Sequence, residues 1–152
     1  MATALEIFNL TMALADEQDS NGNGDNADTA EYKNRTIPIL NTLLNEVYPY
    51  SDTYQAYVQG KRPTLMPITE WDEYIDLDDA ICYSALPYGL GSVLYADENP
   101  TLANFFRQIY EGWLSRLRSG VGMASVSEDI EDVYGGNGSG VDGMPNNPWT
   151  RW

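Results

Sequence analysis

The chain of 152 residues carries 23 acidic and 8 basic side chains and no histidine, which gives it a formal net charge of −15. A chain this acidic repels a phosphate backbone, so we do not expect sequence-specific nucleic-acid binding. The missing histidine removes the commonest general acid–base and the commonest zinc ligand, and the lone Cys82 has no disulfide partner within the chain. The length predicts one domain with a substantial hydrophobic core.

The N-terminus carries no lysine or arginine before Lys33, so it lacks the basic start of a signal peptide. No uninterrupted apolar run approaches the length that crosses a membrane. We therefore expect the protein to be made and kept in a cytoplasm, unless it leaves as part of a larger assembly.

Residues 3–16, TALEIFNLTMALAD, form the first predicted helix, with a broad apolar surface at helical spacing. Such a surface must be buried against the chain's own core or against a neighbouring subunit. Some of the apolar side chains of this helix are therefore candidates for contact with a partner. The face holds Leu5, Phe8, Met12 and Ala15, widened by Ile7, Leu10 and Leu14, and the partner-binding candidates are Leu5, Phe8 and Met12.

The loop DSNGNGDNAD, residues 19–28, matches half of a calcium-binding helix–loop–helix pattern. Its start is in register, but Ala30 occupies the position of the bidentate glutamate and Glu31 comes one residue late. Half a motif is easily met in a loop rich in Gly, Asn and Asp, so it fits an acidic mobile loop better than a metal site, and we predict no metal or cofactor. The weak calcium candidates are Asp19, Asn21, Asn23, Asp25 and Glu31.

A second helix is predicted from Asp28, the N-cap of a capping box with Glu31, to Val47 or Tyr48. Pro38 lies inside it and removes a backbone donor, so we expect a kink or a break there. The apolar stripe comprises Leu40, Leu43, Leu44, Val47 and Tyr48.

Residues 49–77 are rich in proline and aromatic residues and predict a loop-rich insertion, with a short β-hairpin around residues 54–68. Trp71 and Tyr74 are expected to anchor it on the core. An acidic cluster follows at its end, but three of its members start a helix, where carboxylates are favoured without any chemistry. No catalytic motif accompanies them, so we do not expect an enzyme. The cluster consists of Glu70, Asp72, Glu73, Asp76, Asp78 and Asp79.

Two further helices are predicted. The third starts at Asp76 or Asp78, and Pro87 with two nearby glycines indicates a kink or the close approach of another backbone. The fourth begins with Asn99 as N-cap and Pro100 as first residue, and Gly120 is expected to end it. Its apolar stripe comprises Leu102, Phe105, Phe106, Ile109, Trp113 and Leu117.

Residues 119–152 have the glycine, asparagine and proline content of a flexible C-terminal arm. The arm ends in Trp149, Arg151 and Trp152, residue types that are enriched where interfaces bury their energy. These three residues are candidate anchors for a partner; the alternative is a remnant that contacts nothing. The residues alone thus predict an acidic, mainly helical, non-catalytic domain with a C-terminal arm that binds a partner.

One segment of the sequence resembles a known protein family. Residues 75–118 contain an aspartate-rich helix start (LDDA), a kink (ALPYGLGSVL), an acidic turn (ADENP) and a helix with an aromatic pair (FFRQIYEGWL). In this order they resemble the C-terminal helices of head–tail connector (adaptor) proteins of tailed bacteriophages and prophages. The preceding TIPILNTLLNEVYPYSDTY is similar to the second helix of that family, so the resemblance covers about residues 3–118. The acidic loop and the tail from 119 onward have no counterpart.

The resemblance implies a mainly α fold: a small bundle of about four helices over residues 1–118 and an arm over 119–152. It implies a structural virion protein without enzymatic activity or cofactor, which assembles in the bacterial host cytoplasm. Copies would form a ring in the neck, between the portal and the next neck or tail protein, and double-stranded DNA would pass through it without specific binding. The alternative is a non-catalytic protein-interaction module that responds to calcium through residues 19–28.

Overall fold

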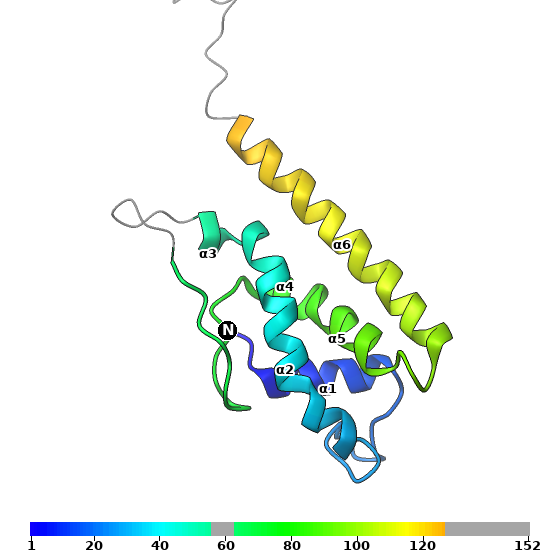
Figure 1. Ribbon diagram of the computed structural model, residues 1–152. Helices are drawn as coiled ribbons and strands as arrows, with labels where there is room; N and C mark the ends of the chain where they lie inside the picture. The colour runs from blue at the N-terminus through cyan, green and yellow to red at the C-terminus, as the bar shows by residue number, and fades with distance from the viewer. Residues whose placement is uncertain (56–62, 127–152) are drawn as a thin grey trace, which may run out of the picture. The chain divides into compact units, whose positions relative to one another are not determined.

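The computed structural model describes residues 1–55 and 63–126, and every regular element in them is a helix (Figure 1). This confirms the predicted mainly α fold of about four main helices. The four longer helices are α1 (Ala4–Leu14), α2 (Ala30–Val47), α5 (Leu86–Leu94) and α6 (Pro100–Val126). Three short ones lie between them: η1 (Tyr48–Tyr50), α3 (Asp52–Gln55) and α4 (Asp79–Ser84).

The chain divides into two compact units, Met1–Ser119 and Gly120–Trp152. Helix α6 continues through this division to Val126, so the prediction that Gly120 ends the helix is wrong. A glycine inside a helix costs about 1 kcal/mol relative to alanine but does not stop it, and VGMASV after Gly120 contains no proline. The remainder of the predicted arm, from residue 127 onward, lies outside the described residues.

Helix α1 begins with a capping box that the sequence analysis did not single out. The side chain of Thr3 accepts a hydrogen bond from the Glu6 backbone N–H at 3.2 Å, and the Glu6 carboxylate accepts one from the Thr3 N–H at 2.9 Å. The bond from the Thr3 N–H is the main reason why the pKa of Glu6 is lowered, with Tyr83 donating a second bond. These bonds satisfy two backbone donors that a helix start leaves free.

Helix α2 begins at Ala30, after Thr29, with no side-chain cap, so the predicted box of Asp28 and Glu31 does not form. The Asp28 N–H, which the box would give to Glu31, donates instead to Asn26 Oδ1 at 2.9 Å, and the Thr29 N–H donates to the same oxygen at 3.1 Å. The helix then runs unbroken through Pro38, so the expected break is absent. The predicted stripe is confirmed by the burial of Leu40, Leu43, Leu44 and Val47.

The third predicted helix is divided in two, as the proline and glycines indicated: α4 ends at Ser84 and α5 starts at Leu86. Pro87 occupies the first turn of α5, where its missing N–H costs nothing. The glycines allow α6 to come close. A β-carbon on Gly89 would lie 3.0 Å from the ring of Tyr110.

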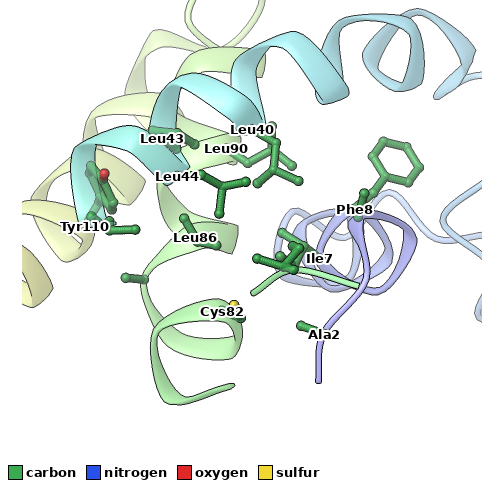
Figure 2. Packing of buried hydrophobic residues seen from close by; sticks show 14 of the residues in the cluster. Ala2, Ile7, Phe8, Leu40, Leu43, Leu44, Cys82, Leu86, Leu90 and Tyr110 are labelled. Atoms are coloured by element: carbon green, nitrogen blue, oxygen red, sulfur yellow. The ribbon is translucent and has the colours of Figure 1, made fainter. Parts of the chain in front are cut away.

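Helix α5 is at the centre of the core, in contact with α1, α2 and α4. Figure 2 shows the leucines of α2 directed toward Leu86 and Leu90 of α5, with Ile7 of α1 beside them and Tyr110 of α6 at the other end. Buried apolar side chains therefore come from every long helix. Those of α2 in this group are Leu40, Leu43 and Leu44.

Residues 63–78 cross the surface without forming a strand, and the middle of the predicted hairpin, residues 56–62, lies outside the described residues. Trp71 packs edge-on against Phe8 with ring centroids 5.7 Å apart, as expected of an anchor. The side chain of Tyr74 is no anchor, because the residue is 66% exposed. Only its backbone contacts the N-terminus, through an isolated bridge with Thr3. Ile75, which is only 1% exposed, anchors the segment on the core instead.

Candidate functional site

The partner candidates on α1 lie mostly inside the core. Phe8 and Met12 are completely buried, so they are not available to a partner, and this part of the prediction is wrong. Phe8 faces Trp71, and the Met12 sulfur lies 3.7 Å from the Tyr95 hydroxyl, which donates to it. Leu5 is half-buried. The broad apolar surface of α1 is thus used by the chain's own fold.

The calcium candidates in the loop cap the loop's own backbone. Asp19 Oδ1 accepts from the N–H groups of Asn21 and Asn23, both at 2.9 Å. Asn23 Oδ1 accepts from the Asp25 N–H at 3.1 Å, and the Asp25 carboxylate pairs with Lys33. The Asn and Asp side chains thus give the loop its shape by hydrogen bonding to nearby backbone groups.

The position of Gly24 also has a packing reason, since a β-carbon there would lie 2.9 Å from the Met12 Cβ. Glu31 is exposed in the first turn of α2. Within residues 1–55 and 63–126, no group of three or more His, Cys, Asp or Glu residues is placed to hold a metal ion. The close packing of Gly24 against Met12 of α1 thus explains the glycine that fits the calcium pattern, without a metal ion.

The acidic cluster at residues 70–79 also has structural roles. The Glu73 carboxylate accepts from two backbone N–H groups just before it, at 2.9 and 3.4 Å, and these bonds lower the pKa of Glu73. Asp78 accepts from the Asp52 N–H at 2.8 Å, and Asp79 pairs with the N-terminal amine at 3.1 Å. Asp78 and Asp79 thus join segments that are distant in the sequence, whereas Glu73 stabilises its own turn.

The three buried tyrosines, Tyr32, Tyr95 and Tyr110, have raised pKa values chiefly because of their burial, and two of them also donate to carboxylates. Tyr32 donates to Glu98, and Tyr110 donates to Glu46 at 3.0 Å. Burial likewise raises the pKa of the Cys82 thiol to about 12. At neutral pH these groups stay protonated, so they serve as hydrogen-bond donors or apolar groups and not as bases or nucleophiles.

The clearest candidate surface is on α6, whose apolar residues divide between two sides of the helix. One side is buried in the core: Ala103, Phe106, Tyr110 and Leu114. The other, which we call the α6 flank, recurs at helical spacing and is half-buried or exposed: Leu102, Phe105, Ile109, Gly112, Trp113 and Arg116. The predicted stripe joined residues from both sides and missed the buried Ala103, Tyr110 and Leu114.

The α6 flank presents apolar, aromatic and cationic groups together. Phe105 is 56% exposed although its ring contacts that of Phe106, with centroids 6.1 Å apart. The Arg116 guanidinium lies over the Trp113 ring, 5.0 Å from its centroid. Exposed aromatic residues beside arginine are typical of surfaces that bind other proteins. Of the predicted anchors, Trp149, Arg151 and Trp152 lie outside the described residues.

No protein-family model, curated protein or solved structure matches this chain. No helix in the described residues is both long and apolar enough to cross a bilayer.

Proposed function

We propose that the chain is a head–tail connector, a structural protein of the phage neck that joins the portal of the capsid to the tail. The observation that carries the proposal is the α6 flank, an apolar and aromatic surface that is only partly covered by the helical core, with Phe105 56% exposed. A ring subunit needs such a surface in addition to its own core, because each copy must bury area against its neighbours.

The segment that resembles connector proteins, residues 75–118, provides α4, α5 and most of α6. Its kink coincides with the division between α4 and α5, and its aromatic pair supplies one buried ring, Phe106, and one exposed ring, Phe105. The resemblance and the candidate surface thus fall on the same part of the chain, which supports a role in assembly.

The charge of the chain supports a channel function. DNA that slides through a ring must not be gripped by its phosphates, and a net charge of −15 favours repulsion over binding. The protein would act in the virion neck after assembly in the bacterial host cytoplasm. Its partners would be the portal, the next neck or tail protein and further copies of itself.

The proposal includes no catalysis. The acidic cluster at residues 70–79 binds backbone N–H groups and the N-terminal amine, and the buried tyrosines stay protonated. The calcium-responsive alternative gains no support from the loop at residues 19–28, since its carboxylate and amide oxygens already accept backbone hydrogen bonds.

Binding to the portal tests the proposal. The full chain and the portal protein of the same genome are purified, mixed, and examined by electron microscopy and native mass spectrometry. We expect a ring with a central channel on one end of the portal. A chain that neither forms a ring nor binds the portal contradicts the function.

The predicted arm is tested in the same assay with a chain that lacks residues 135–152. If Trp149, Arg151 and Trp152 anchor the chain on the portal, this variant loses portal binding while its circular dichroism spectrum keeps the helical signal of the core. Unchanged binding would show that the anchor lies elsewhere.

A further inference from the structure

We propose that the α6 flank is the surface by which one copy of this chain docks on the acidic surface of a second copy. The inference deepens the proposed function and rests on it, because a connector ring requires a contact between neighbouring copies. It names the helix side, the residues and the electrostatics of that contact, and three features of the structure support it.

The first feature is a glycine with no reason inside the described fold. Gly112 is exposed in the middle of α6, and within residues 1–55 and 63–126 no atom beyond its own helix backbone lies within 4 Å of the position a β-carbon would take. Gly89 and Gly91, in contrast, each face an aromatic ring of α6. A mid-helix glycine lowers helix stability relative to alanine, so a packing reason is expected, and Gly112 leaves room for the close approach of another backbone.

The second feature is the apolar surface around Gly112. Phe105 precedes it by two turns of the helix and Ile109 by three residues, so all three lie on one side of α6. Phe105 is more than half exposed, at 56%, and Ile109 is half-buried. Two large apolar side chains beside a glycine resemble a helix-packing surface, with ridges on both sides of a gap.

The third feature is charge. Residues 100–119 contain three arginines and one glutamate, a net charge of +2, which leaves −17 for the rest of the chain. Two copies therefore repel each other over most of their surfaces. On the flank the opposite charge is that of Arg116, because Arg107 pairs with Glu111 and Arg118 donates to the Tyr50 hydroxyl. Arg116 on the flank stacks on Trp113 and forms no ion pair within the described residues. Its charge remains free to pair with a partner.

The same charges select the arrangement of the copies. Packing one α6 flank against another would bring arginines of equal charge together, whereas packing it against the acidic body of the next copy joins opposite charges. The second arrangement uses different surfaces on the two copies, and such head-to-tail contacts form a ring when the rotation between successive copies closes. The occupant is thus a second copy, bound through a surface other than its own α6 flank.

Self-association of the full chain tests the inference with two matched pairs of variants. Gly112→Leu fills the gap on the flank, and Asn104→Leu adds the same leucine to an exposed position on another side of α6. Arg116→Glu reverses the flank charge, and Arg107→Glu makes the same change away from the flank, where Arg107 pairs with Glu111 at 3.2 Å. Dissociation constants are measured by sedimentation equilibrium at low and high salt.

We expect Gly112→Leu and Arg116→Glu each to weaken self-association about tenfold or more, and the difference between Arg116→Glu and the wild type to narrow at high salt, which screens the charge of residue 116. The control variants Asn104→Leu and Arg107→Glu should change it less than about twofold. Equal effects within either pair overturn the inference. So does a wild-type chain that stays monomeric at its highest soluble concentration.

Two further outcomes separate this inference from the proposed function. Rings that bind the portal but do not respond to Gly112→Leu or Arg116→Glu leave the connector function standing and reject the flank as the interface. Copies that associate through the flank but never bind the portal do the reverse.

Discussion

Gly91 of α5 lies directly against the ring of Phe106 of α6, and a β-carbon at residue 91 would be 2.4 Å from the ring's Cδ2 atom. The Phe106 ring is only 2% exposed and is flanked by the rings of Tyr88 and Tyr95, at centroid distances of 5.7 and 6.4 Å. Because the ring is enclosed, it has little room to give way. The approach of α5 to α6 therefore depends on the absence of a side chain at residue 91.

Gly91→Ala should consequently destabilise the protein, although alanine is the better helix former. We expect the free energy of unfolding to fall by about 1–3 kcal/mol, since overpacking a buried contact outweighs the gain in helix propensity. Urea unfolding followed by circular dichroism measures it. The matched control is Gly112→Ala, where the added carbon meets no atom of another described segment within 4 Å and should stabilise the monomer by up to about 1 kcal/mol. Equal shifts in the two variants would contradict this account of Gly91.

The capping box of α1 gives a second prediction. Thr3→Ala removes the oxygen that accepts the Glu6 N–H, so the free energy of unfolding should fall by about 1 kcal/mol. Asp28→Ala is the control, because the box expected around Asp28 does not form and its effect should stay within about 0.5 kcal/mol. A larger loss from Asp28→Ala than from Thr3→Ala in urea unfolding would reverse this assignment of the caps.

These caps show what local sequence rules could and could not predict. The T-x-x-E pattern of a capping box stands in the sequence at Thr3 and Glu6, and attention to the first helical turn would have found it. In the equally regular pattern at Asp28, the Asp28 N–H that the box would give to Glu31 donates to Asn26, two residues earlier. Asn26 and Glu31 compete for the same donor, and only the folded loop decides between them.

Local sequence signals predict where the helices lie. They do not always predict which side of a helix is buried. Pro87 was sufficient to locate the division between α4 and α5, and the spacing of leucines identified the buried stripe of α2. On α6 the apolar residues cover more than half of the circumference, so periodicity cannot tell the core side from the flank. The glycines of α5 decide it, because they admit Phe106 and Tyr110 and leave Phe105 outside.

The buried tyrosines predict how stability depends on alkaline pH. Burial is the largest cause of the raised pKa values of Tyr32, Tyr95 and Tyr110, and nearby carboxylates add to it. Below a pH of about 10 these hydroxyls are protonated in both the folded and the unfolded chain. Above it the unfolded chain loses protons that the folded chain keeps, so the free energy of unfolding should fall as pH rises.

The variants Tyr95→Phe and Tyr110→Phe test this directly. Each removes one group with a raised pKa, so the fall in stability between about pH 10 and 11 should be shallower than in the wild type. The exposed Tyr74 supplies the control, Tyr74→Phe, whose pH profile should parallel that of the wild type. Urea unfolding at stepped pH gives the slopes. Parallel profiles for all four proteins would mean that these hydroxyls titrate alike in the folded and unfolded chains.

The last prediction concerns the loop around Asp19. Its carboxylate holds two backbone N–H groups, and the loop is closed further by a bond from the Asp19 N–H to the Asn23 carbonyl at 3.0 Å. Asp19→Ala should therefore lower the free energy of unfolding by about 1 kcal/mol, while Asp19→Asn, which keeps an acceptor oxygen, should lose less.

Calcium should not alter this result. Thermal unfolding of the wild type and of Asp19→Ala is compared in millimolar calcium and in chelator, which covers even the weakest sites of the helix–loop–helix class. Because the oxygens of the loop are engaged with its own backbone, we expect the same difference in melting temperature under both conditions. If calcium raised the melting temperature of the wild type and not that of Asp19→Ala, the loop would be a metal site, since a ligand that binds only the folded chain stabilises it.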